Sequence, residues 1–448
     1  MELNCNAKKL IELLLSAGYD AYAVGGCVRD SIIGREVGDI DITTSATPKE
    51  VETVLDSNGI RYIETGIKHG TVTAVFDGEN IEITTFRTDG DYLDNRHPEN
   101  VSFVRDIKED LSRRDFTMNA IAYNDKKGIV DLFCGKEDIE NSLIRAVGDP
   151  DKRFKEDALR IMRAIRFASV LGFDIEKETK KAIFDNKELL NDISSERIFK
   201  ELIQLLLGDN CEKVLLEYRD IIAVIIPELE PCFDYPQNSK WHIYDVYTHM
   251  VKSVALAPKN DVIRFSLLIH DIGKPFCKTT DSRGQDHFKG HPKISAEIAA
   301  GILKRLKVSR EFLRKNVLLI KIHDWFITKD RSNIKMWLRI LDEELIFDFI
   351  DLKIADLLTH NPELTVGEVE ELEEIRELVK DVISSNEPYK ISDLDIDGNA
   401  LVSIGFKGRS ISEELERLAV LISDYPEFNE FDKLSNQAVR DKFEIYGD

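Results

Sequence analysis

Long apolar runs are missing from this chain of 448 residues, and none approaches the roughly 20 residues that a bilayer-spanning helix needs. The first residues, MELNCNAKKLIELLLSAGYDAY, lack both a basic start and a small-residue cleavage site, so we expect no signal peptide. We therefore expect no membrane partner. The hydrophobic fraction of 43% is ordinary for a globular protein and excludes wholesale disorder.

Cysteine is scarce and scattered along the chain. The cysteines form no C-x-x-C pair, and they are Cys5, Cys27, Cys134, Cys211, Cys232 and Cys277. Such spacing argues against a disulfide framework and against a zinc ribbon. It favours a protein of the reducing cytoplasm.

Basic charge is in deficit, with 61 Lys and Arg against 83 Asp and Glu and a net charge of −22. As an average, that balance argues against a nucleic-acid partner. The deficit is concentrated in residues 341–448, which carry 28 acidic and 10 basic side chains, whereas residues 303–339 carry 11 basic and 3 acidic ones. The first three quarters can therefore meet RNA, and we expect salt-sensitive RNA binding governed by the body that holds this basic stretch and by the neck at residues 146–230.

Short strand-like runs alternate with short helical runs over residues 1–145, which predicts an α/β region built on a mixed sheet. The strand-like runs are AYAVGG (21–26), DIDITT (39–44), TVTAVF (71–76) and IEITTF (81–86). The tetrad DGEN (77–80) predicts a hairpin turn between the last two. Thr47, Pro48 and Glu50 predict a helix start with a capping box.

Helical periodicity replaces the strand signal from residue 152 onward. Three prolines mark a boundary near residue 230, and a Gly- and Asp-rich turn precedes acidic terminal helices. We therefore expect four parts: residues 1–145, a helical neck at 146–230, a helical body at 231–385 and an acidic helical tail at 386–448.

A glycine pair followed by two spaced carboxylates forms the first candidate site. Gly25-Gly26 ends a strand and opens a helix, where backbone amides can approach a phosphate closely. Asp39 and Asp41 lie two apart on an expected strand, so both would face one side and repel unless a cation lies between them. These hard oxygen ligands suit Mg²⁺ carried by a nucleoside triphosphate, with Glu82 as a candidate third carboxylate. A solvated strand end is the plainer interpretation.

An arginine-rich region follows at 111–119 and continues in a helix expected over 156–166. Arginines there can bind triphosphate oxygens in bidentate fashion. Asp157 and Arg160, three apart, share a helix face, and the simple interpretation is a surface salt bridge. The functional interpretation is a base template, because a carboxylate accepts from the exocyclic amine of adenine or cytosine while arginine donates to the ring nitrogen. Such a pair accepts ATP and CTP and rejects GTP and UTP.

Seven segments in this order closely resemble class II tRNA nucleotidyltransferases, the CCA-adding enzymes, over about residues 1–210. They are GGCVRD, GDIDITTSATP, TGIKHGTVTAVF, RRDFTMNAIAY, DLFCGKEDI, RAVGDP and EDALRIMRAIRFASVLGF. The resemblance implies metal-holding and catalytic carboxylates at Asp39 and Asp41 and a base template at Asp157 and Arg160. It also implies nucleotide-binding residues at Gly26, Arg29, Arg114, Arg163 and Arg166.

The segment 85–98 resembles the family's flexible loop, which is associated with the switch from C to A addition. The resemblance points to Arg87, Asp91 and Arg96 there, although this chain has Arg-His-Pro where relatives commonly have Arg-Arg-Pro. CC-only enzymes lack the loop, whereas bacterial poly(A) polymerases share the other motifs. Poly(A) polymerase therefore stays open as an alternative.

Histidines and aspartates recur on successive expected helices of the body. Each alone is more often a core residue than a ligand, but together imidazole and carboxylate suit Mn, Fe, Co, Ni or Zn. The series resembles HD-domain phosphohydrolases. The resemblance implies a metal site of His249, His270, Asp271 and Asp356, with His291 and His323 available for a second ion. It also implies phosphohydrolase or phosphodiesterase activity, with Lys274 as a phosphate contact.

We therefore expect an α+β multidomain enzyme with a nucleotidyltransferase-type mixed-sheet head, a helical neck, an HD-type all-helical body and a helical tail. Its expected reaction is template-independent addition of CCA to the 3′ end of tRNA from CTP and ATP. Besides poly(A) polymerase, two alternatives remain. One is an HD phosphohydrolase whose head only anchors RNA, and the other is a catalytically inactive RNA-binding module.

Overall fold

The structure, a computed structural model, describes residues 3–89, 101–385 and 387–446. It divides into two compact units, one of Met1–Pro227 and Arg305–Lys307 and the other of Glu228–Lys304 and Val308–Asp448. Within the described residues, none of the helices is both long and apolar enough to span a bilayer.

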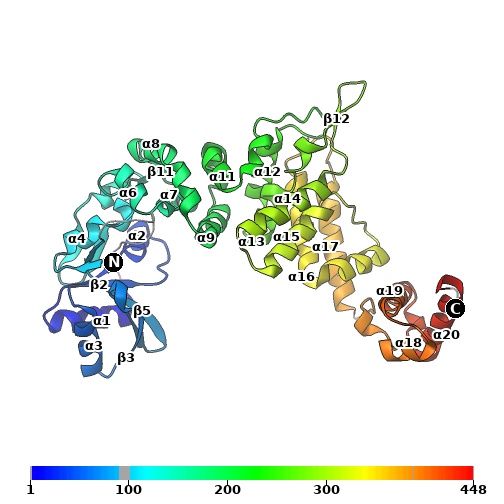
Figure 1. Cartoon of the computed structure of the whole chain (residues 1–448), viewed down its shortest axis with the longest axis horizontal. Coiled ribbons are helices and arrows are strands. Elements are labelled where there is room, and N and C mark those ends of the chain that lie inside the picture. The colour runs from blue at the N-terminus through cyan, green and yellow to red at the C-terminus, as the bar shows by residue number, and fades with distance from the viewer. Residues whose placement is uncertain (1–2, 90–100, 386, 447–448) are drawn as a thin grey trace. The chain divides into compact units, whose positions relative to one another are not determined.

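The first unit begins with a seven-stranded sheet, drawn in blue and cyan in Figure 1. In spatial order its strands are β3 (Arg61–Gly66), β4 (Thr71–Phe76), β5 (Glu79–Thr85), β2 (Asp41–Thr44), β1 (Ala21–Val24), β8 (Ile121–Asn124) and β9 (Gly128–Asp131). β2 and β5 run parallel, and the other neighbouring strands are antiparallel. The expected mixed sheet is confirmed.

Two local signals in the sheet region are confirmed as well. The turn between β4 and β5 places Asp77 at φ 48° and Gly78 at φ 83°, the backbone that a two-residue hairpin needs. In helix α3 (Pro48–Ser57), Glu50 accepts a hydrogen bond from the backbone of Thr47 and completes the capping box.

The sheet is accompanied by short helices and one small strand pair. They are α1 (Cys5–Ser16), α2 (Gly26–Ile33), α4 (Ile107–Ser112), α5 (Gly135–Glu140), β6 (Arg87–Asp89) and β7 (Val101–Phe103). Tyr22 and Val24 of β1 pack with Phe86, Leu111 of α4 and Ala122 of β8 in one buried cluster. This cluster holds α4 against the sheet beside β1.

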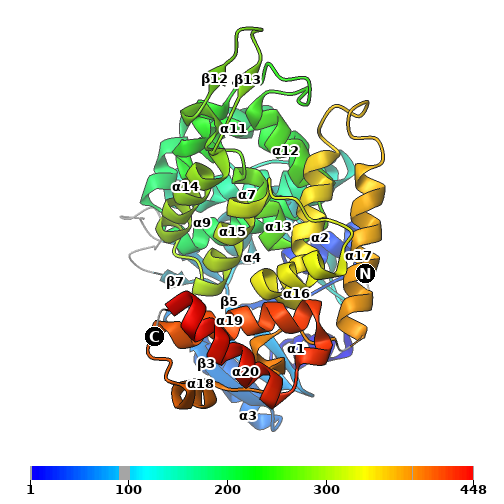
Figure 2. The same ribbon diagram turned by 90° about the vertical axis from the view of Figure 1, so that its right-hand side faces the viewer.

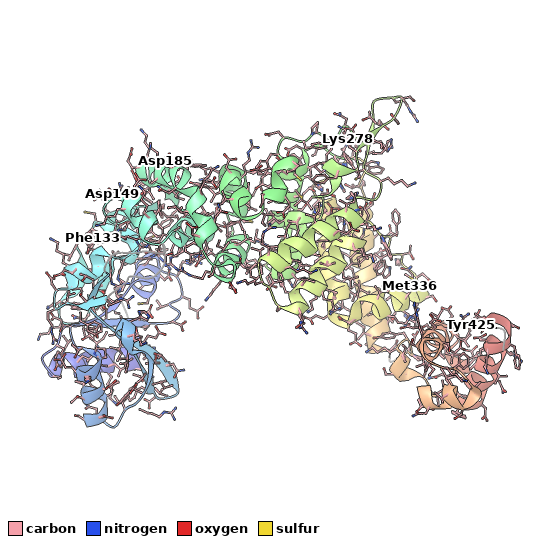
Figure 3. All side chains as sticks on the ribbon, viewed as in Figure 1. Phe133, Asp149, Asp185, Lys278, Met336 and Tyr425 are labelled. Atoms are coloured by element: carbon pink, nitrogen blue, oxygen red, sulfur yellow. The ribbon has the colours of Figure 1, made fainter. Side chains whose placement is uncertain are left out.

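Six helices follow in the same unit: α6 (Pro150–Glu156), α7 (Leu159–Leu171), α8 (Lys177–Asp185), α9 (Ser195–Leu206), α10 (Cys211–Glu217) and α11 (Arg219–Ile225). Asp149, labelled in Figure 3, caps α6. The continuous helix expected over 156–166 is wrong, because Asp157 has extended backbone (φ −141°, ψ 102°) and separates α6 from α7. Residues 174–175 also form a short strand, so the strand signal does not end at residue 152.

The second unit is mainly helical: α12 (Val246–Leu256), α13 (Asp261–Ile269), α14 (His291–Arg305), α15 (Arg310–Ile322), α16 (Arg331–Leu357) and α17 (Glu368–Ser384). α17 packs along α16, and β12 (Thr279–Thr280) with β13 (Asp286–His287) projects from the helices (Figure 2). α16 is kinked at Asp342 (φ 67°), whose carboxylate caps the following turn by accepting from the backbone of Glu344 and Leu345.

The basic stretch 303–339 is largely paired with acidic residues of the same unit. Lys335 is buried, with Nζ 2.8 Å from Glu387 Oε2. Lys329 pairs with Glu374 at 2.6 Å, and Arg331 pairs with Asp381 and Glu387. These pairs offset part of the positive charge of the stretch, and its role in RNA binding stays a prediction.

The acidic tail contains α18 (Gly398–Ile404), α19 (Arg409–Asp424) and α20 (Phe431–Asp441), which enclose a small apolar core of Leu401, Phe406, Leu418, Ile422 and Leu434. The exposed Tyr425, labelled in Figure 3, directly follows α19.

The carboxyl group of Glu414 in α19 is fully buried, and neither oxygen makes a hydrogen bond within the described part of the chain. Burial and the carboxylate of Asp441 raise its pKa from 4.5 to about 7, against the opposing charge of Arg417. Between these two values the folded tail keeps a proton that the unfolded chain has released. We therefore expect tail stability to fall by roughly 2 kcal/mol as pH rises from about 4.5 to about 7.

Urea unfolding across this pH range would measure the change. Glu414→Gln should remove the pH dependence and be more stable than the wild type at pH 8. Glu413→Gln, which changes the exposed neighbour, should keep the wild-type profile. An unchanged pH dependence in Glu414→Gln would contradict the assignment.

Candidate functional site

The first site lies at the end of three neighbouring strands of the head sheet. Val24 of β1 stands opposite Asp41 of β2, and Ile42 of β2 stands beside Ile83 of β5. Because β2 and β5 are parallel, Asp41 and Glu82 occupy the same level on adjacent strands. Gly25 and Gly26 follow Val24 directly. The sheet thus brings the glycine turn and two predicted carboxylates together at the same end of neighbouring strands.

Asp39 does not lie on the strand, contrary to the sequence prediction. β2 begins at Asp41, and the exposed Asp39 precedes it in a loop. Partial burial raises the pKa of Asp41, as do the negative charges of Glu82 and Asp39, while Arg114 opposes the change. Asp39, Asp41 and Glu82 therefore act on one another electrostatically without sharing a strand. Such mutual repulsion is what a divalent cation relieves.

Next to the carboxylates, the glycine turn opens helix α2. Gly25 has φ 80° and ψ −132°, a conformation that glycine adopts readily, and no side chain caps the helix. A Cβ on Gly25 would lie 3.3 Å from Arg114 Nη1, so this arginine lies across the turn. Arg29 is buried and donates from Nη1 to Asn119 Oδ1 at 2.8 Å. The turn, Arg29 and Arg114 form an electropositive corner for a phosphate.

The predicted template residues, Asp157 and Arg160, do not pair with one another through their side chains. Asp157 Oδ2 accepts from Arg197 Nη2 at 2.8 Å, and its Oδ1 accepts from the backbone of Leu159 at 3.1 Å. Arg160 is buried and donates to Glu156 at 2.8 Å and to the backbone oxygen of Arg113 at 2.9 Å. The simple surface salt bridge is therefore wrong, and both side chains are held by other partners.

Arg163 and Arg166 continue along α7. Arg163 donates twice to Asp115 Oδ2, at 2.9 and 2.6 Å, and Arg166 donates to Glu201 Oε2 at 2.6 Å. Burial opposes ionisation of Asp115, but Arg163 lowers its pKa to about 2. Both guanidinium groups also lie over the Phe167 ring, at 5.5 and 3.8 Å from its centroid.

Arg87 of the predicted loop begins β6, and its side chain donates to the backbone oxygen of His69. The other two predicted loop residues, Asp91 and Arg96, lie outside the described residues.

The second site gathers the histidine and aspartate series in the helical unit. Three groups have ligand atoms within 4.8 Å of one another: His249, His270 and Asp271; Asp271, His291 and His323; and His242, His249 and His360. Asp356 joins them, with Oδ1 2.9 Å from His249 Nε2 and 3.4 Å from His270 Nε2. The structure thus brings all six predicted ligands together. Within the described residues, these groups all belong to this unit and none to the head.

Backbone contacts orient each imidazole towards the cluster. Nδ1 of His270, His291 and His323 lies 2.7–2.9 Å from a backbone carbonyl oxygen, and Nδ1 of His249 lies 2.8 Å from the Thr359 hydroxyl. A carbonyl only accepts, so each of these three rings keeps a proton on Nδ1 and turns Nε2 towards the cluster as the atom that can bind a metal ion. His291 Nε2 and His323 Nε2 face each other at 3.1 Å.

The donor set fits a divalent cation. His249 Nε2, His270 Nε2 and Asp356 Oδ1 are buried, and although Asp356 lies 2.9 and 3.4 Å from the two rings, none of these atoms has a well-aligned hydrogen bond within the described part of the chain. Burial would lower the pKa of His270, but the charges of Asp271 and Asp356 raise it to about 10. At His249 burial prevails and lowers the pKa to about 4, so this imidazole is neutral and its Nε2 is free to bind a metal ion. Imidazole with carboxylate is the ligand set of transition metals.

Sequence reasoning missed His242 and His360 as members of the cluster. His360 Nε2 lies 3.2 Å from His242 Nε2, which lies 3.1 Å from Lys274 Nζ. The spacing of four from Asp356 to His360 would place both on one face of a continuous helix and could have revealed His360, although α16 ends at Leu357 and His360 lies beyond it. Lys274, predicted to contact phosphate, already contacts Asp271 at 2.5 Å and Gln237 at 2.7 Å.

An open cleft of about 1300 Å³ leads to the cluster. Asp271, His291 and His323 lie in its wall, while Trp241 and Phe326 line it with their side chains 41% and 86% exposed. A phosphate ester can therefore reach the cluster, with exposed aromatic rings beside it.

Three family models match the chain in succession. The Poly A polymerase head domain matches residues 21–145, the probable RNA and SrmB-binding site of polymerase A matches 172–233, and the HD domain matches 242–359. Together with the sheet edge and the metal-ligand cluster, they define a nucleotidyltransferase head joined to an HD domain.

Relatives with known names agree. The chain is 51% identical over 214 residues to the CCA-adding enzyme of Lactobacillus helveticus, covering 48% of this chain and 53% of that one. It is 43% identical over 262 residues to that of Pediococcus pentosaceus, covering 57% and 65%. The Bacillus stearothermophilus CCA-adding enzyme in complex with CTP matches the structure with a TM-score of 0.71 at 27% identity, covering 98% of both chains. The chain is thus similar to CCA-adding enzymes in sequence over about half of its length and in structure over nearly its whole length. It spans about half the length of the first two curated relatives.

Proposed function

We propose that this protein adds CMP, CMP and AMP to the 3′ end of tRNA, using CTP and ATP and no nucleic-acid template. The observation that carries the proposal is the meeting of the Gly25 turn, Asp41 and Glu82 at the ends of neighbouring strands, beside Arg114. Solved and curated relatives bear the name CCA-adding enzyme, one of them in complex with CTP. We place the activity in the cytoplasm, in line with the scattered cysteines.

In this reaction Asp39, Asp41 and Glu82 would hold Mg²⁺, which neutralises the triphosphate and acidifies the attacking hydroxyl when bound. The amides after Gly25, with Arg29 and Arg114, would bind the triphosphate oxygens. Phosphoryl transfer of this kind depends mostly on position and charge, which these groups supply. Arg163 and Arg166 would complete the nucleotide pocket.

Asp157 and Arg160 would read the base. Arg197 orients the Asp157 carboxylate, and each of its oxygens retains a lone pair for the exocyclic amine of cytosine or adenine. Arg160 would donate to the ring nitrogen. Guanine and uracil would place a carbonyl oxygen opposite the Asp157 carboxylate and a ring N–H opposite Arg160, so neither side chain could form its hydrogen bond.

An extension assay tests the whole proposal. Recombinant protein with Mg²⁺ and a tRNA lacking CCA should add two residues from CTP alone and three from CTP with ATP. No extension would refute the proposal. A ladder from ATP alone, with no use of CTP, would select poly(A) polymerase instead.

Removal of the base template should relax nucleotide choice. Asp157→Ala deletes the acceptor for the exocyclic amine, so preference for CTP and ATP over UTP and GTP should fall by about 10- to 100-fold. Competition assays with paired nucleotides measure the ratio. Asp185→Ala, which removes an exposed neck carboxylate, should leave it unchanged. Full discrimination in Asp157→Ala would rule out the template.

We further propose that the HD domain is a metal-dependent phosphohydrolase or phosphodiesterase. His249, His270, Asp271 and Asp356 would hold one ion of Mn, Fe, Co, Ni or Zn, with His291 and His323 available for a second. The unpartnered buried ligand atoms and the open cleft support this assignment. A bound ion would supply a hydroxide nucleophile at neutral pH.

A further inference from the structure

The carboxylate of Asp110, in α4, is fully buried within the head and is satisfied by four residues. Its Oδ2 accepts from Thr43 Oγ1 and Arg114 Nη2, both at 3.2 Å. Its Oδ1 accepts from Arg113 Nε at 3.1 Å and Nη2 at 2.8 Å, and from the backbone of Arg87 at 3.4 Å. One carboxylate therefore joins β2, β6 and the arginine pair.

Two of these partners, Thr43 and Arg114, belong to the two parts of the candidate nucleotide site, the carboxylates and the glycine turn. Thr43 lies two residues after Asp41 on β2, so both side chains are on the same face of the strand. Arg114 reaches from Asp110 across the Gly25 turn, where its Nη1 would lie 3.3 Å from an added Cβ. Asp110 therefore contacts both β2, the strand that bears Asp41, and the guanidinium of Arg114, which would bind the phosphate.

A charged anchor is required at this position. A buried carboxylate is stable only when paired, and two guanidinium groups pair with this one. Burial would raise the pKa of Asp110, but Arg114 and Arg113 lower it below the usual value. An uncharged side chain of the same size would leave the arginines without their common partner and free to change orientation.

We propose that Asp110 is a positioning residue that sets the spacing between the Asp41 strand and Arg114. It touches neither the metal nor the nucleotide. It holds Arg114 over the glycine turn by a direct contact. It holds β2 in place through its contact with Thr43. The inference rests on the proposed nucleotidyl transfer, because it concerns the same site.

Asp110→Asn tests the role with little change in volume. We expect the affinity for CTP to fall about tenfold, since a charge-assisted contact to phosphate loses its support, while affinity for CMP changes less than twofold. KM for CTP and ATP should rise together, kcat should fall, and discrimination against GTP and UTP should stay intact. Equilibrium binding of CTP and CMP, with steady-state extension, gives these values.

Glu50→Gln is the matched control. Glu50 also accepts from a threonine hydroxyl, a backbone amide and an arginine (Thr47 and Arg105), but away from the site. It should lower the stability of the head and keep the CTP-to-CMP affinity ratio. If Asp110→Asn keeps that ratio, or Glu50→Gln loses it equally, the inference is wrong.

Thr43→Val supplies a second test if Asp110→Asn does not fold. It removes only the bond from β2 to Asp110, so kcat should fall several-fold with little change in CTP affinity. An unchanged kcat would overturn the inference. If the wild type does not extend tRNA, only the proposed function is refuted. The inference on Asp110 is still tested, because comparing the affinities for CTP and CMP needs no nucleotidyl transfer.

Discussion

Asp41→Asn should lower the rate of CMP and AMP addition by on the order of a thousandfold, the several kcal/mol expected when a catalytic metal ligand is lost. Asp41 stands at the level of Glu82 and acts electrostatically on both Glu82 and Asp39, so its loss removes the central carboxylate of the three. Fold should be retained, because Asn has nearly the same volume as Asp and the change removes one of three mutually repelling charges. Single-turnover extension of a tRNA lacking CCA measures the rate.

Glu64→Gln provides the control on the same sheet. Glu64 is an exposed carboxylate of β3, at the far edge from β1, and its change should leave the rate within twofold of the wild type. Near-normal extension by Asp41→Asn would show that the metal is held elsewhere. Hydrolysis by the HD domain should be unaffected in both variants.

Asp271→Asn should abolish metal binding and phosphate-ester hydrolysis by the HD domain, with a loss on the order of a thousandfold. Asp271 is fully buried and is shared by two of the three ligand groups, lying 3.3 Å from His270 and 3.0 Å from His291. Its neutral replacement removes a charge that each group uses. Metal content per chain and hydrolysis of bis(p-nitrophenyl) phosphate measure the two effects.

Asp348→Asn is the matched change in the same helical unit. Asp348 is a partly buried carboxylate bonded to Asn260, and burial raises its pKa to about 6. This variant should keep both metal and hydrolysis. Normal tRNA extension by Asp271→Asn is expected, and metal retained at the wild-type level would refute the assignment.

Local patterns predicted local structure well. Alternation and the DGEN turn predicted the β4–β5 hairpin, and Thr47 with Glu50 predicted the start of α3, because turn and cap chemistry depend on a few neighbouring residues. The helix break at Asp157 was missed. The apolar spacing continues through it, and the contact that holds Asp157 comes from Arg197, 40 residues away.

Charge patterns describe composition and leave the pairing of individual charges to the fold. In the basic stretch 303–339, whose role in RNA binding stays a prediction, Lys329, Arg331 and Lys335 pair with Glu374, Asp381 and Glu387. The net charge of a stretch cannot show which of its basic residues pair with acidic residues elsewhere in the chain. His360 was missed because its neighbour His242 is 118 residues distant along the chain.

Residue types and their spacing were enough to predict two candidate sites, one of carboxylates and glycine in the head and one of imidazole and carboxylate in the body. They were enough because each chemistry needs particular side chains within short motifs. The assembly of those motifs depended on long-range contacts: the parallel pairing that sets Asp41 beside Glu82, the burial of Asp110 beneath Arg114, and the packing that turns each Nε2 inwards. Strand register and burial depend on the whole packed chain, so only folding sets these distances.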